Sequence, residues 1–229
     1  MEENKNKEQN INTEEIKKET VETVNQVKET IKNVNIKNDA KEATGFVSSM
    51  FKDPFGTLKQ IVNDNTNKYL KTAIIFVIVW MVAILISKLF SVSISSFSVK
   101  IAFSKVSSII KAVIAPLVGV VVFSGIVYFM NKENKKSITT ILTAVVTAKI
   151  PVIVASIVSL LTIIDSKISL ITSPFASLCN VISIVLIYFA TKTIFGEEQN
   201  SKFFKKFVKI EAIYYVVYIV VSLLGIYMK

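Results

Sequence analysis

One lysine stands inside a long apolar stretch, a place where a charge is costly and often functional. Lys149 lies within residues 138–164, and Pro151 follows it two residues later. A proline removes one backbone donor and kinks a helix, so the freed carbonyls can bind an ammonium group. Ser156 shares a helical face with Lys149, because the two are seven residues apart. These residues predict a polar, kinked site inside a membrane helix.

A second interpretation of Lys149 places residues 138–148 at the membrane interface. The span then starts near Ile150, and the lysine snorkels to the cytoplasmic surface. One central lysine costs roughly 3 kcal/mol on an insertion scale, and the fifteen Ile, Leu and Val residues of 138–164 return about 4 to 9 kcal/mol, so the helix still inserts. Pro116 predicts a kink in the preceding apolar run and joins the candidate site.

Other kinds of chemistry lack the residues that they need. The chain has no histidine and one cysteine, which excludes Ser-His-Asp and Cys-His catalysis, the HExxH zinc motif and a disulfide framework. No glycine run precedes a lysine with the phosphate-binding spacing. Asp165 and Glu211 are expected at membrane interfaces. We therefore expect no enzymatic activity, no catalytic residue, no cofactor and no metal ion.

Membrane helices must position these residues. Five runs free of ionisable side chains occupy 72–87, 112–131, 150–164, 168–191 and 212–228. A bilayer core of ~30 Å needs ~20 apolar residues in a helix, and each run reaches that length with its polar flanks. Lipid cannot satisfy backbone amides, and unbroken aliphatic runs do not alternate as barrel strands do. The sequence predicts an all-α polytopic protein, a five-helix transmembrane bundle with spans at about 69–90, 112–131, 138–164, 168–191 and 210–228.

The distribution of lysine predicts the orientation of the bundle. The formal net charge is +10, while residues 1–68 hold 11 lysines against 12 acids, so the excess lies in the membrane half. These lysines flank apolar runs and do not cover one soluble face, which argues against a nucleic acid partner. Among the lysines beside the spans, twelve lie inside and six lie outside when the N-terminus is cytoplasmic. The inner set is Lys52, Lys59, Lys68, Lys71, Lys132, Lys135, Lys136, Lys192, Lys202, Lys205, Lys206 and Lys209, and the outer set is Lys88, Lys100, Lys105, Lys111, Lys167 and Lys229. We expect an inner N-terminus and an outer C-terminus in a bacterial plasma membrane.

Two polar pieces precede the first span. Residues 1–45 predict a cytoplasmic tail that is either largely disordered or an amphipathic helix, because aliphatic residues recur along it at three- and four-residue steps. Residues 46–68 predict a juxtamembrane amphipathic helix on the inner leaflet, with Asp53 as its N-cap and Pro54 as its first residue. The membrane domain then covers 69–229.

Three segments follow the pattern of a known family. They are Phe51-Lys52-Asp53-Pro54, residues 138–151 with their apolar continuation to Leu161, and Phe195-Gly196 followed by 201–207. Their order resembles the Yip (Ypt-interacting protein, Yip-one type) domain family, here in its bacterial five-span form with a cytosolic N-terminal region. The resemblance implies an α-helical scaffold that recruits or organises membrane partners, and it supplies no catalytic residue. The eukaryotic Asp-Leu-x-Gly-Pro element is absent, so binding of a Rab-type GTPase is not implied.

Two functions of different classes follow from these patterns. The first is a non-enzymatic scaffold or partner-recruiting protein of the membrane. The second is a small permease or accessory transporter subunit with its polar site around Lys149. In either case we expect contact with the lipid bilayer and a protein partner, or a homo-oligomer formed through helix packing.

Overall fold

The computed structural model describes residues 2–33, 36–64, 66–91, 99–131, 134, 136–196 and 199–223. Across these ranges the chain forms helices and turns and no strand. In chain order the elements are α1 (Glu2–Lys32), α2 (Ile36–Lys52), α3 (Pro54–Asn63), α4 (Leu70–Ser91), α5 (Val99–Met130), α6 (Ile138–Ala148), α7 (Ile150–Val158), η1 (Ser159–Ile163), η2 (Ser166–Ile168), α8 (Ser169–Ile194) and α9 (Asn200–Leu223). The predicted all-α fold is confirmed.

Several of these helices are long and apolar enough to cross a membrane. The candidate spans are Leu70–Phe90 in α4, Val106–Met130 in α5 and Ser166–Ile194 in η2 and α8. A fourth combines Ile138–Ala148 with Ile150–Ile163, two segments bent by 43°. A multi-pass membrane protein is therefore confirmed.

The predicted fifth span, 210–228, corresponds to the second half of α9. The structure describes α9 to Leu223, so residues 224–228 of that span lie outside the described part. The first half of α9 carries four lysines, and α9 is not among the candidate spans. A fifth crossing stays a prediction.

Capping side chains start α3 and α6. Asp53 Oδ1 accepts a hydrogen bond from the amide of Gly56 at 2.9 Å, and Pro54 is the first residue of α3. Ser137 Oγ accepts one from the amide of Thr140 at 3.1 Å. Amides in the first turn of a helix lack an intrahelical partner, and these side chains supply it.

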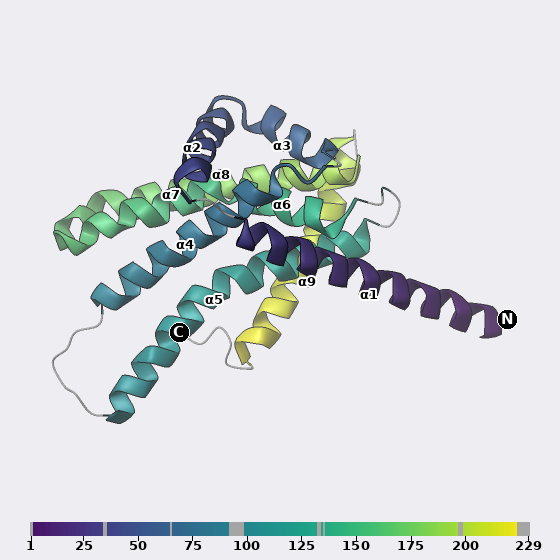
Figure 1. Cartoon of the computed structure of the whole chain (residues 1–229), viewed down its shortest axis with the longest axis horizontal. Helices are drawn as coiled ribbons and strands as arrows, with labels where there is room; N and C mark the ends of the chain where they lie inside the picture. The colour runs from purple at the N-terminus through teal and green to yellow at the C-terminus, as the bar shows by residue number, and fades with distance from the viewer. Residues whose placement is uncertain are drawn as a thin grey trace.

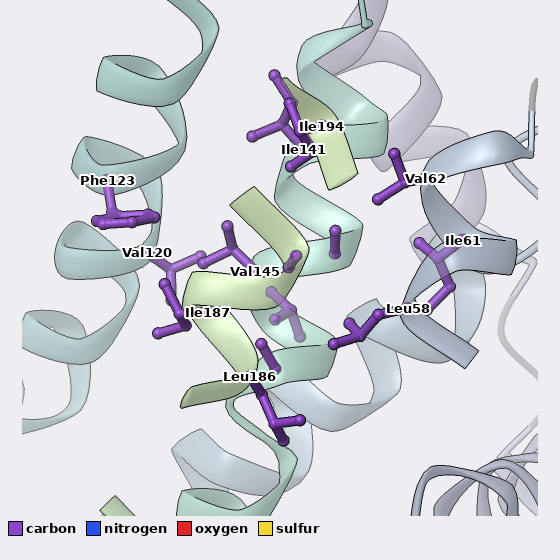
Figure 2. Packing of buried hydrophobic residues seen from close by; sticks show 14 of the residues in the cluster. Leu58, Ile61, Val62, Val120, Phe123, Ile141, Val145, Leu186, Ile187 and Ile194 are labelled. Carbon is purple, nitrogen blue, oxygen red and sulfur yellow. The ribbon is translucent and has the colours of Figure 1, made fainter. Parts of the chain in front are cut away.

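The centre of the bundle is α6, which packs against α3, α4, α5 and α8. Nine of its eleven residues are buried, which is the pattern of a helix surrounded by protein. Figure 2 shows Ile141 and Val145 among side chains from α3, α5 and α8. On α3, Leu58, Ile61 and Val62 are buried in the same core. The apolar side of α3, which belongs to the segment predicted to lie on the inner leaflet, therefore contacts α6 and α8.

The C-terminal half of α1 lies against one end of the bundle, and its N-terminal half extends past the other helices (Figure 1). The hydroxyls of Thr23 on α1 and Thr139 at the start of α6 lie 3.3 Å apart. At the same end, Asn134 Nδ2 donates to the carbonyl of Ile194, the last residue of α8, at 3.4 Å. Under the predicted orientation this is the cytoplasmic end.

An aromatic cluster holds the first half of α9 against α8. The ring of Tyr188 makes edge contacts with Phe203 and Phe207, at centroid distances of 5.0 and 5.1 Å. Phe203 and Phe207 are buried, while the neighbouring Lys202 and Lys205 are exposed. This part of α9 is therefore amphipathic, with its apolar face on α8.

The domain limits at 45/46 and 68/69 stay predictions. The tail 1–45 contains α1, a continuous helix over its described length. Helix α2 runs across the first limit, 45/46. The second limit falls in the turn between α3 and α4.

Candidate functional site

The break between α6 and α7 places Lys149. This lysine follows the last residue of α6 and precedes the first residue of α7. Pro151 has no amide hydrogen, so the carbonyl of Thr147 loses its intrahelical donor, and the proline ring crowds that carbonyl. The two helical segments bend by 43° at this point. Lys149 consequently stands at the bend, where its side chain lines a cavity.

The cavity has a volume of about 470 Å³. Residues from α4, α5, α6, α7, α8 and α9 contribute to its walls together with Lys149. Its aromatic, amide and charged lining residues are Trp80, Phe123, Lys149, Asn180, Glu211, Tyr214, Tyr215 and Tyr218. Small-molecule pockets have volumes of roughly 300–1,000 Å³ and combine apolar walls with a few polar groups, and this cavity has both properties.

Lys149 and Glu211 reach the cavity from two helices that begin at the same end of the bundle. The helix start is Ile138 for α6 and Asn200 for α9, so each charged residue comes eleven residues after the first residue of its helix. No salt bridge within 4.0 Å joins them. The cavity therefore holds one positive and one negative group at separate positions.

Glu211 belongs to a polar face of α9. Tyr214, Tyr215 and Tyr218 follow it three, four and seven residues later and line the same cavity. This spacing keeps all four side chains on one side of a helix. The face of α9 toward the cavity thus combines a carboxylate with three phenol rings.

The cavity opens sideways between α8 and α9. Its inner wall includes Trp80, which is 7% exposed, and Phe123, which is 5% exposed. At its rim, Ile184 of α8 is 55% exposed, and Tyr215 and Tyr218 of α9 are 61% and 40% exposed. Both helices present apolar surfaces of the kind that lipid covers. Under the predicted five-span arrangement, this opening faces the bilayer.

The structure brings some of the predicted site residues together and separates others. Lys149 and Pro116 both line the cavity. Pro151 is buried beside the bend but does not line the cavity. Ser156 does not line the cavity either, and its Oγ donates a hydrogen bond to the carbonyl of Val152 at 2.9 Å. Asp53 and Pro54 belong to the start of α3, which is a different part of the protein.

Sequence reasoning missed most of the cavity. Glu211 was expected at an interface, and Trp80 and Asn180 were not considered. One signal was available: Glu211, Tyr214, Tyr215 and Tyr218 form a polar and aromatic face at helical spacing. No sequence pattern indicates that this face meets Lys149, since the two are more than sixty residues apart.

A second group of polar contacts attaches α1 to the bundle. The carboxylate of Glu19 accepts hydrogen bonds from the phenol of Tyr128 and from the amide of Ile138, the latter at 3.1 Å. Thr139 Oγ1 donates to Gln26 Oε1 at 3.4 Å. A carboxylate at the first amide of α6 also interacts favourably with the helix dipole. In the described part of the chain no group of three His, Cys, Asp or Glu residues could hold a metal ion.

These helices, with a bent span and a cavity among them, define a multi-pass α-helical membrane protein. The family model of the Yip1 domain matches residues 48–228, and the chain belongs to this family. The predicted family is therefore confirmed, while its bacterial five-span form stays a prediction. No curated protein and no solved structure matches the chain. The matched region starts within α2, so α1 lies outside it.

Proposed function

We propose that this Yip1 domain protein is a non-enzymatic scaffold that recruits a protein partner at the cytoplasmic face of a bacterial plasma membrane. The observation that supports this proposal most is α1, which precedes the family domain and is held on the bundle by one face. A helix docked on one side leaves its other side available for a partner.

The docked face of α1 is polar. Thr23 is buried, and its hydroxyl lies next to that of Thr139. Glu19 and Gln26 lie on the same side of the helix and contact the start of α6. These contacts orient α1 by hydrogen bonds and do not involve Val21, Val24 or Ile31.

A different face of α1 exposes aliphatic side chains. Val21 is 58% exposed, Val24 45% and Ile31 51%. At 100° per residue they lie about 80–160° around the helix from Thr23. An amphipathic helix that offers aliphatic residues at this spacing is a common ligand for a groove on another protein. Since the docked face points to the bundle, Val21 points away from the bilayer, which favours a protein partner over a lipid surface.

Site-specific photo-crosslinking in native membranes tests the proposal. A crosslinking residue at Val24 or Ile31 should form an adduct with a second polypeptide. The matched control carries the same crosslinking residue in place of Glu29, which is exposed but points to a different side of α1 from Val24 and Ile31. This control should form little adduct. Replacing Val21, Val24 and Ile31 by serine should remove the partner while the membrane domain stays folded. Absence of an adduct from Val24 and Ile31, or equal adducts from Glu29, would contradict recruitment through α1.

The cavity supports a second candidate, a small permease or accessory transporter subunit. The supporting observation is that Lys149 and Glu211 line one cavity inside the bundle. Charged groups within membrane segments commonly mark solute pathways. In proteoliposomes, Lys149→Leu should abolish solute flux while folding and the α1 adduct are retained. Unchanged flux would exclude a transport path through Lys149.

A further inference from the structure

The cavity next to the α6/α7 bend has a charge pattern that fits one chemical class of ligand. We infer that it binds the headgroup of a zwitterionic phospholipid, with the phosphate at Lys149 and the ammonium at Glu211. This inference goes beyond partner recruitment by α1, because it concerns the binding of a lipid in the cavity, which is separate from the surface of α1.

The first argument is charge balance. Lys149 and Glu211 line the same cavity without forming a salt bridge to each other. A charge removed from water is stable only when it is paired and hydrogen-bonded. A purely anionic ligand would satisfy the lysine and leave the carboxylate beside a like charge. A ligand that carries both charges at separate positions satisfies both residues at once.

The second argument is the composition of α9. Tyr214, Tyr215 and Tyr218 lie on the same face of α9 as Glu211 and line the cavity with it. Aromatic faces attract cations, and the effect grows when water is excluded. The carboxylate and the neighbouring rings therefore form a cation-binding half of the cavity. Lys149, on the α6/α7 side, provides the anion-binding half.

The third argument is the route of entry. The exposed rim of the cavity includes Ile184 on α8 and Tyr215 on α9, and the inner wall is closed by buried residues. A ligand enters between two helices whose outer surfaces are apolar, so it comes from the lipid phase. Acyl chains can remain in the bilayer while the headgroup occupies the cavity. A water-soluble zwitterion such as phosphoethanolamine shares the headgroup chemistry but lacks these chains.

Trp80 provides a direct reporter. It is the single tryptophan of the chain, it lines the cavity and it is 7% exposed. Bromine atoms near the ester end of an acyl chain stay next to the headgroup, and they quench tryptophan fluorescence at short range. We would place the full-length protein in nanodiscs of phosphatidylglycerol and add brominated phosphatidylethanolamine or, separately, phosphatidylglycerol with the same brominated chains. The anionic lipid measures quenching by general lipid contact.

We expect half-maximal quenching by the zwitterionic lipid at a mole fraction about tenfold lower than by the anionic lipid, as one charge-assisted contact in the cavity would produce. In Lys149→Met and in Glu211→Gln, the two lipids should reach half-maximal quenching at the same mole fraction. Lys149→Arg, which keeps the charge, should retain most of the difference. Lys167→Met and Asp165→Asn, which change exposed residues outside the cavity lining, should behave as wild type.

Three results would overturn the inference. The first is equal quenching of the wild-type protein by both lipids, which needs no variant to interpret. The second is a lipid preference that survives in both Lys149→Met and Glu211→Gln. The third is displacement of the brominated lipid by soluble phosphoethanolamine at an equal concentration, because the ligand would then come from water.

Discussion

The carboxylate of Asp39 on α2 lies 2.7 Å from the ammonium of Lys71 on α4. The Asp39 side chain is 6% exposed and that of Lys71 is 37% exposed, so one partner of the pair is removed from water. The pair ties the helices that precede the membrane domain to the start of the first span.

Breaking this pair should weaken the protein. Asp39→Ala should lower the free energy of unfolding by roughly 1–3 kcal/mol, between the values of exposed and of buried pairs. Thermal unfolding followed by Trp80 fluorescence would measure the change. Glu42→Ala, which removes an exposed acid of the same helix, is the control and should have little effect. A stability loss that is equal in both variants would show that the ion pair does not matter.

Gly196 should resist substitution, because its backbone is left-handed. Its φ is +61°, and an added Cβ would lie 3.2 Å from Asn134 Nδ2. Gly196→Ala should cost about 1–2 kcal/mol of stability. Gly45→Ala is the matched control, since Gly45 lies inside α2 with nothing within 4 Å of an added Cβ. Gly45→Ala should gain about 0.5–1 kcal/mol of stability. A larger loss of stability in Gly45→Ala than in Gly196→Ala would contradict this explanation.

Ser183 is a fully buried residue of α8 whose hydroxyl has no hydrogen-bond partner among the described residues. An unsatisfied hydroxyl is costly to bury, so Ser183→Ala should raise stability by about 1 kcal/mol. Thr191 is equally buried, but its Oγ1 donates to the carbonyl of Ile187 at 2.7 Å. Thr191→Val should therefore lower stability or leave it unchanged. Equal shifts of the unfolding temperature in both variants would contradict this reasoning.

The attachment of α1 should depend on Glu19. Glu19→Ala removes the acceptor for Tyr128 and Ile138, at a cost of about 1–3 kcal/mol for the groups left unpaired. We expect faster proteolytic cleavage between α1 and α2 and an intact membrane domain. Glu14→Ala changes an exposed acid of the same helix and should leave the cleavage rate as it is in the wild type. Identical rates for both variants would show that α1 is held by other contacts.

The orientation can be tested with single cysteines. Cys179 is the one cysteine of the chain and is buried, so Cys179→Ser gives a clean background. In intact cells an impermeant thiol reagent should label Lys167→Cys and spare Lys205→Cys, both of which are exposed positions. The predicted cytoplasmic side of Lys205 follows from the lysine distribution. The opposite labelling would show an inverted bundle.

Local patterns carried much of the correct prediction. Apolar length indicated the membrane helices, and the order of motifs indicated the family, because both depend on residues that are near each other in the chain. The cap at Asp53 and the lysine inside the third apolar stretch were visible for the same reason. Contacts between helices that are distant in the sequence were not visible. For example, α3 was expected to lie on lipid, but its apolar residues Leu58, Ile61 and Val62 are buried against α6 and α8.

The sequence by itself determined that this chain is a helical membrane protein of the Yip domain family, since insertion depends on the length and apolarity of single segments. Only the tertiary structure decided that Glu211 shares a cavity with Lys149 and that α1 docks through Glu19. An apolar helix face has no intrinsic preference between lipid and another helix. Which residues meet is set by how all the helices pack together, and no single segment contains that information.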